Sequence, residues 1–298
     1  MAAPTPRVDN FTQIAYSVTP DGIAIVSLNR PKYRNPIGRT CTLELDAAFT
    51  AACNDDAVKV IILRGEGDSF SSGHDLGTPD EKKDATVSKL QADGFRGDYE
   101  RWSYLDVDMC LKWWNMRKPL ICAVKGYVVY HAFAVMAIAD IIIAADDVKL
   151  MPSLVEFTSL PWDLNLNIRK TKELLYSQRF ILADEAEELG IVNRIVPRGK
   201  EDEEALGLAR IIVKTDPFQL RMMKLAANQA ADSAGYSVNI RSSLSHWTAY
   251  RASSTDPASN AVATGSKRFA PIKESEKEDV MYWSRTAPKA RKGERGKL

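Results

Sequence analysis

The strongest constraint on the fold of this 298-residue chain comes from three short, almost wholly apolar runs: Val58–Leu63, Leu120–Val124 and Ile141–Ala145. Strands that are buried on both faces, as in a parallel sheet, have this kind of continuous apolar sequence. Segments with the apolar spacing of helices lie between the three runs. Alternation of buried strands with helices indicates an α/β fold built on a largely parallel core sheet.

The amino-terminal part adds two strands and a helix to this pattern. Two runs rich in β-branched residues, Ile14–Thr19 and Ile23–Leu28, flank the turn-forming residues Pro20-Asp21-Gly22. This order predicts a strand, a turn and a second strand. Apolar residues at helical spacing then predict a helix over Thr40–Cys53.

The carboxyl-terminal third is expected to form a helical layer and no second sheet. Asp216-Pro217 is a favourable helix start, because proline fits the first helical turn. Two stretches look irregular: Gly77–Asp98, expected to be a loop or loose helix over a site, and the basic Pro288–Leu298, expected to be a frayed tail. The predicted helices are Ala183–Leu189, Glu201–Lys214, Pro217–Ala230 and Tyr236–Ala252.

Charge and hydropathy exclude several classes of partner. The 40 basic and 39 acidic side chains nearly cancel, so the whole-chain charge favours neither nucleic acid nor an anionic membrane as a partner. The segment Met1–Arg7 lacks the apolar core of a signal peptide. The most apolar run, Ala132–Ala145, is interrupted by Asp140 and is too short to span a bilayer.

The four cysteines give no sign of a zinc site, since they form no C-x-x-C pair and no His-x-x-x-His lies nearby. Most of them lie in apolar segments, so we expect buried, reduced thiols in a cytoplasmic protein. They are Cys41, Cys53, Cys110 and Cys122.

Two glycine-containing turns follow the buried strands. The chain turns at Gly73 after the first apolar run and at Gly126 after the second, where a helix is expected over Val128–Ala139. Ligands bind beyond the carboxyl ends of the strands in open α/β sheets, and a helix amino terminus adds positive potential. Two backbone N–H groups that converge there would stabilise an enolate or a tetrahedral oxyanion.

Four segments, in order and at the right spacing, resemble the crotonase superfamily, also called the enoyl-CoA hydratase/isomerase family. Asn29–Asn35 resembles its N-R-P-x-x-x-N segment, and Ser71–Leu76 resembles its S-A-G-x-D-L turn. Lys118 to Asp140 matches its K-P-x-I-x-A-V-x-G-Y…D segment, and Phe180–Pro197 resembles its remaining signature. The resemblance covers about Ile23 to Pro197.

The resemblance implies a crotonase-type ββα spiral fold with a helical carboxyl-terminal region. It implies a core domain over residues 8–200, a helical trimerisation region over 201–287 and a basic flexible tail over 288–298. Relatives act on an acyl-CoA thioester, so the coenzyme A arrives with the substrate and no metal or redox cofactor is implied. They usually form trimers or dimers of trimers.

The resemblance also assigns roles to individual residues. The backbone N–H groups of His74 and His131 would be the two oxyanion donors. Lys32, Tyr33 and Arg34 lie where the family contacts the CoA nucleotide. The turn residues Ser72, Asp75 and Leu76 are grouped with this CoA site, although the Asp75 carboxylate has the alternative role of capping the following turn.

Departures from the family pattern affect the acid–base chemistry. The Gly-Gly-Gly of relatives is Tyr130-His131-Ala132 here, and the two glutamates that handle water in typical hydratases map onto Ala134 and Leu154. Hydration of a double bond therefore has no evident proton carrier in the usual place. An oxyanion hole made of main chain survives these changes.

Several side chains could replace the glutamates. The imidazole of His131 has the right pKa range for proton transfer, or it is only a bulky plug. Asp163 is either a nucleophile or base, as in related dehalogenases, or a helix N-cap. Glu156 and Ser153 lie in the same stretch, with Glu156 interpreted as a supporting or surface carboxylate, and His74 could add its side chain.

These options leave three functions open. The first is an enoyl-CoA hydratase-like lyase. The second is a crotonase-type hydrolase of a carbon–carbon or carbon–halogen bond that uses His131 or Asp163. The third is a catalytically silent acyl-CoA-binding protein. The remaining histidine, His246, is expected to pack in a helix or to face a neighbouring subunit.

Overall fold

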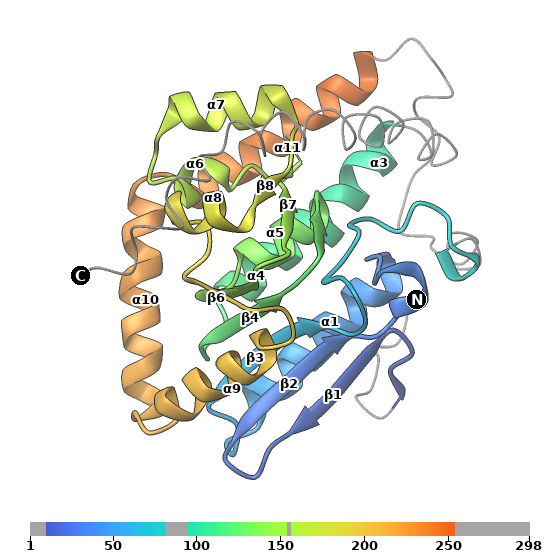
Figure 1. Ribbon diagram of the computed structural model, residues 1–298. Helices are drawn as coiled ribbons and strands as arrows, with labels where there is room; N and C mark the ends of the chain where they lie inside the picture. Colours follow the sequence, from blue (N-terminus) through green and yellow to red (C-terminus); the bar gives the residue numbers. More distant parts are fainter. Residues whose placement is uncertain (1–9, 82–94, 154–155, 254–298) are drawn as a thin grey trace.

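A six-stranded sheet lies at the centre of the molecule in the computed structural model, which describes residues 10–81, 95–153 and 156–253 (Figure 1). The first two strands run antiparallel, and every other neighbouring pair is parallel. The predicted α/β class is confirmed, and the five predicted strands agree with the observed ones within two residues. The strand order is β1 (Ile14–Val18), β2 (Ile23–Leu28), β3 (Val60–Gly65), β4 (Leu120–Val124), β6 (Ile141–Ala145) and β9 (Arg194–Val196).

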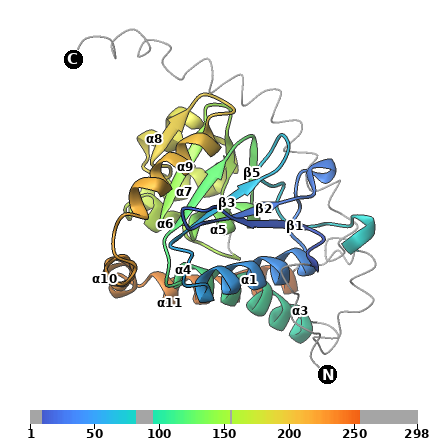
Figure 2. The ribbon, with the colours of Figure 1, turned by 90° about the horizontal axis from the view of Figure 1, so that it is seen from below.

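The apolar strands are buried on both faces, as their sequences predict. In β3, Ile61 and Leu63 belong to the main core together with residues of α1 (Arg39–Asn54). The alternate residues, Val60 and Ile62, pack on the other side with alanines of α9 (Glu201–Ile212). Figure 2 shows α1 and α9 on opposite sides of these strands. Strand residues point alternately to the two faces, so both kinds of position must be apolar.

A small second sheet corrects the helix predicted from Val128. Its strands are β5 (Tyr127–Val129), β7 (Lys149–Met151) and β8 (Ile181–Leu182). The helix expected from Val128 begins only at His131 and forms α5 (His131–Ala137), because the preceding valines pair with β7. The expectation that only helices follow Ala183 was also wrong, since β9 joins the edge of the main sheet.

Three consecutive helical segments form one long helical run before β4. It consists of α3 (Phe95–Trp102), a π-helical segment η3 (Ser103–Asp108) and α4 (Met109–Trp114). The irregular stretch predicted over Gly77–Asp98 lies partly outside the described residues, and its last four residues already belong to α3. Single π-turns within α-helices are rare and often mark functional sites.

The remaining helices confirm the predicted carboxyl-terminal layer. The three later predicted helices correspond to α9, α10 and α11, and α8 matches Ala183–Leu189 to within one residue. The predicted tail Pro288–Leu298 and the end of the predicted trimerisation region lie outside the described residues. The helices not yet given are η2 (Pro31–Tyr33), α6 (Leu160–Asp163), α7 (Ile168–Ser177), α8 (Ala183–Glu188), α10 (Pro217–Ser233) and α11 (Tyr236–Ser253).

Two further predictions concern the thiols and the membrane. All four cysteines are free, and three are buried, which confirms reduced thiols in apolar surroundings. Within the described ranges, no helix combines the length and the apolar character needed to cross a membrane.

Candidate active site

Asn35 joins the first two motif segments. Its side-chain amide donates hydrogen bonds to the carbonyl oxygens of Glu66, Ser69 and Phe70, at 2.8, 3.0 and 3.2 Å. The backbone N–H of Ser72 donates to the carbonyl of Arg34 at 2.9 Å. The turn after β3 is therefore held against the segment that follows β2.

The turn at Gly73 brings the two expected oxyanion donors to the same place. Gly73 has a φ of 89°, and a Cβ atom there would lie 2.4 Å from the carbonyl oxygen of Val129 and 3.8 Å from the backbone nitrogen of His131. Only glycine allows this approach of two backbones. The amide of His131 belongs to the first turn of α5, where N–H groups have no intrahelical acceptor.

Tyr130 holds the junction between β5 and α5 in an unusual conformation. Its φ of 50° and ψ of −107° lie where residues other than glycine are rare. Its N–H donates to the carbonyl of Met151 at 2.8 Å, and its carbonyl accepts a hydrogen bond from the Ser153 hydroxyl at 2.7 Å. The role of Ser153 seen here is thus to fix the backbone just before His131.

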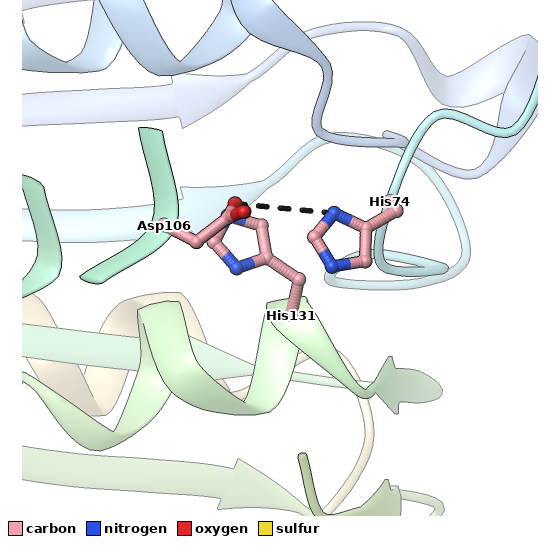
Figure 3. A group of neighbouring side chains, drawn as sticks. All are labelled: His74, Asp106 and His131. Carbon is pink, nitrogen blue, oxygen red and sulfur yellow. Dashed lines mark ion pairs between the residues drawn. The ribbon is translucent and has the colours of Figure 1, made fainter. Parts of the chain in front are cut away.

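Three side chains from different elements meet beside this junction, as Figure 3 shows. His131 Nε2 lies 3.2 Å from Asp106 Oδ1, and His74 Nδ1 lies 4.0 Å from the same oxygen. The two imidazole rings are stacked, with centroids 4.5 Å apart and planes 5° from parallel. We call His74, Asp106 and His131 the His–Asp–His cluster.

Asp106 is the member of this cluster that the sequence interpretation missed. It lies on the π-helical segment η3, in line with Trp102 and Cys110 at intervals of four residues. A carboxylate on an otherwise apolar helical stripe is the signal that could have revealed it. The π-turn itself has no recognisable sequence pattern in this segment.

Burial changes the protonation of the cluster. It raises the pKa of Asp106 well above its usual value; nearby Arg101 lowers the pKa, and nearby Glu156 raises it further. Burial also lowers the pKa of His131 to about 4. Burial therefore favours the neutral form of both the imidazole and the carboxyl group.

The cluster also has the donor types of a metal site, with one donor atom from each residue within 4.8 Å of the others. The ring geometry does not fit this role. An imidazole binds a metal ion in its own plane, and two stacked, nearly parallel rings cannot both direct a nitrogen at one ion. The arrangement suits proton transfer better than metal ligation.

Asp75 has the structural role that the sequence left as an alternative. Its Oδ1 accepts hydrogen bonds from the N–H groups of Gly77 and Thr78, so the capping interpretation is confirmed. Its Oδ2 forms a buried ion pair with Arg30 at 2.7 Å. Burial raises the pKa of Asp75, but the hydrogen bonds from Thr78 and Arg30 outweigh it and hold the pKa below its usual value.

The residues expected near the CoA nucleotide form an exposed basic edge. Lys32 lies over the ring of Tyr33 at 5.5 Å, and both side chains are exposed. Arg34 and Lys149 lie 5.3 and 5.1 Å from the ring centre of Tyr127. Of the other two expected residues, Leu76 is exposed and Ser72 is partly buried. Clustered cations with aromatic rings suit an anionic nucleotide.

Asp163 lies at the end of α6 rather than at its start, so its interpretation as an N-cap was wrong. The N-cap is Ser159, whose hydroxyl donates to Asp163 Oδ2 at 2.9 Å. Burial raises the pKa of Asp163 to about 6, although that hydrogen bond lowers it. Asp163 influences the pKa of Tyr236 in α11, and the described hydrogen bonds and ion pairs include none between Asp163 and the cluster.

The other sequence candidates take different places. Glu156 is buried and influences Asp106, so its interpretation as a surface carboxylate was wrong, whereas a supporting role fits. Ala134 is fully buried in the main core, and Leu154 lies outside the described residues. His246 is exposed on α11, while the neighbouring Trp247 packs against Trp102.

Comparisons with known proteins show which family the chain matches. The family model described as enoyl-CoA hydratase/isomerase matches residues 18–246. A putative enoyl-CoA hydratase, EchA13, from Mycobacterium tuberculosis is 34% identical over 251 residues, which cover 78% of each chain.

Solved structures agree with this comparison. A probable enoyl-CoA hydratase from Mycobacterium smegmatis has 35% identity and a TM-score of 0.70, with 78% of this chain and 92% of that chain covered. An enoyl-CoA hydratase/isomerase from Xanthobacter autotrophicus Py2 has 30% identity and a TM-score of 0.72, with coverage of 80% and 87%.

Proposed function

Because the chain belongs to the enoyl-CoA hydratase/isomerase family of acyl-CoA-processing enzymes, we propose that it adds water to an enoyl-CoA double bond, with Asp106 as the proton donor and His131 as its partner. The observation that carries this proposal is the 3.2 Å approach of His131 Nε2 to Asp106 Oδ1 beside the backbone of Gly73 and His131. In this proposal the pair takes the place of the two glutamates that the resemblance maps onto Ala134 and Leu154.

The reaction follows from the positions of these groups. The thioester oxygen accepts hydrogen bonds from the backbone N–H groups of His74 and His131, which stabilise the enolate formed when water adds to the β-carbon. Asp106, whose burial raises its pKa and so favours the protonated form, transfers its proton to the α-carbon. The resulting carboxylate is stabilised by the adjacent imidazole of His131, which becomes a better proton acceptor as the negative charge forms.

The proposed enzyme also has an expected cofactor requirement, nucleotide site, location and assembly. It requires no metal or redox cofactor, because the coenzyme A enters as part of the substrate. The basic edge of Lys32, Tyr33 and Arg34 binds the nucleotide end. We place the protein in the cytoplasm, in line with its bacterial relatives, as a trimer or a dimer of trimers.

A mass-spectrometric turnover screen tests the proposed reaction. Purified protein is incubated with enoyl-, β-keto- and haloaryl-CoA esters, and we expect one enoyl ester to gain a single water without cleavage. Release of free thiol would instead indicate a thioester hydrolase, and cleavage of a carbon–carbon or carbon–halogen bond would indicate one of the hydrolase alternatives. Binding of all esters without turnover would indicate a silent acyl-CoA-binding protein.

Substitution of Asp106 tests its assigned role. Asp106→Asn keeps the shape of the side chain but removes the transferable proton, so we expect kcat for hydration to fall about 10²- to 10⁴-fold with little change in KM. Asp108→Asn is the matched control, because Asp108 is on the same π-helical segment but pairs with Arg241 at the surface. Equal kcat values for the two variants would contradict the role of Asp106.

A further inference from the structure

We propose that the imidazole of His74 is the base that takes the proton from the attacking water. This inference rests on the proposed hydration and adds the residue which that reaction still lacks. It concerns the side chain of His74 and is separate from the oxyanion role of its backbone N–H. The His–Asp–His cluster then works as one unit, with the carboxyl group of Asp106 shared between two imidazoles.

Packing holds the His74 ring in a defined orientation. One face of the ring is stacked on His131 at 4.5 Å, and Trp102 contacts the ring edge-to-face at 4.6 Å and 81°. Trp102 in turn packs against Trp247 of α11. A side chain that only extended from a turn would not need ring contacts from two other elements, whereas a base must be oriented toward its substrate.

Solvent access distinguishes His74 from the other two members of the cluster. The side chain of His131 is 1% exposed, that of Asp106 is 10% exposed, and that of His74 is 19% exposed. His74 is therefore the most accessible side chain of the three, although its Nε2 atom is itself buried. Burial also makes His131 a weak base at neutral pH, because its pKa falls to about 4. Of the two imidazoles, His74 is the one suited to remove a proton from water.

The proton transfers of this reaction take place among the water, the substrate and the cluster. As the water oxygen bonds to the β-carbon, one water proton passes to His74, and the π electrons of the double bond move toward the thioester oxygen. Asp106 gives its proton to the α-carbon, which leaves an imidazolium beside a carboxylate. His74 then returns one proton to Asp106 across the 4.0 Å between Nδ1 and Oδ1, a gap that one bridging water can span.

The described contacts of His74 include ionisable side chains. They are Asp106 of η3 and His131 of α5. Arg101 and Glu156 act on the cluster through Asp106, and Trp102 carries no charge. Protonation of His74 at low pH would remove the base, so the pH profile of kcat/KM should have an acid limb that depends on the His74 side chain.

The test is His74→Gln, which removes the base but keeps the backbone N–H that serves as oxyanion donor. We expect kcat to fall about 10²-fold or more, with unchanged KM, loss of the acid limb and partial rescue by added imidazole. His246→Gln is the matched control, because His246 is the one histidine of the sequence outside the cluster and is exposed on α11. His74→Asn and a thermal melt of each variant show whether folding is retained.

The outcomes separate this inference from the proposed function. If the wild-type protein hydrates no enoyl-CoA, the proposed function fails. If the wild type is active and a folded His74→Gln variant keeps its rate and its acid limb, the role of His74 as base fails while hydration stands. Activity that is lost on chelation and restored by Zn²⁺ would also overturn the role, because His74 would then be a metal ligand.

Discussion

Two buried carboxyl groups, Asp106 and Asp163, show how neighbours decide what a residue can do. Burial raises the pKa of both. Asp106 lies 3.2 and 4.0 Å from nitrogens of two imidazoles, whereas Asp163 accepts a hydrogen bond from the Ser159 hydroxyl and influences Tyr236. We therefore interpret Asp106 as part of the chemistry and Asp163 as a buried acid that reduces stability.

Asp163→Asn is expected to stabilise the protein above pH 6. Because the pKa of Asp163 rises from 3.8 to about 6, the unfolded chain loses this proton at lower pH than the folded protein does. Stability therefore decreases as pH rises through this interval, and an asparagine, which does not ionise, avoids the loss. We expect a gain of about 3 kcal/mol in the free energy of unfolding above pH 6 and little gain at pH 4.

Chemical denaturation at both pH values measures this difference. Asp56→Asn is the control, because Asp56 is exposed in the turn before β3 and its replacement should give no such pH-dependent gain. A loss of stability for Asp163→Asn at pH 7 would mean that the folded protein stabilises the carboxylate form.

At the scale of elements, the junction of β5 and α5 positions the site. The pairing of β5 with β7, the bond from Tyr130 N–H to Met151 and the bond from Ser153 to the Tyr130 carbonyl together fix where α5 begins. The π-helical segment η3 does the same for Asp106 from the other side. Strain at Tyr130 is kept because these contacts determine its backbone, which is common at functional sites.

The strain at Tyr130 can be measured with a pair of variants. Because the φ of Tyr130 favours glycine, we expect Tyr130→Gly to be at least about 1 kcal/mol more stable than Tyr130→Ala. The same pair at Tyr176, exposed within α7, should show the opposite order, since glycine costs about 1 kcal/mol relative to alanine inside a helix. Thermal unfolding of the four variants measures the stability difference between glycine and alanine at each site. If alanine is the more stable variant at both sites, the backbone of Tyr130 is not strained.

At the scale of the whole molecule, α10 is oriented unlike an ordinary surface helix. Its buried residues are the polar Lys224 and Asn228, whereas apolar side chains such as Phe218 and Met223 are exposed. Lys224 forms an ion pair with Asp140 and the amide of Asn228 donates to the carbonyl of Trp114, so polar contacts hold α10 on the core. An exposed apolar helix face favours association with another chain.

The proposed trimer or dimer of trimers can be tested at this face. Met223→Lys places a charge on a side chain that is 54% exposed, and we expect it to shift the sedimentation velocity toward smaller species. Val18→Lys, on the exposed edge strand β1, is the control and should leave the assembly unchanged. A wild-type protein that sediments as a monomer would rule out the trimer.

Much of the framework follows from local sequence patterns. The apolar runs of β3, β4 and β6 predicted a largely parallel sheet, because residues buried on both faces must be apolar. The turn at Gly73 and the motif resemblance placed the two expected oxyanion donors, since their role depends on backbone rather than side chains. These features are local, so a short window of sequence contains the information.

The assembly of the His–Asp–His cluster, in contrast, depends on the tertiary structure. His74, Asp106 and His131 are 32 and 25 residues apart in the chain, and they meet only because η3, α5 and the turn after β3 pack together. The sequence also could not show that Val128 and Val129 pair with β7 instead of joining α5. Contacts between distant segments and the burial that they cause set these partners and their pKa values, and no local pattern encodes either.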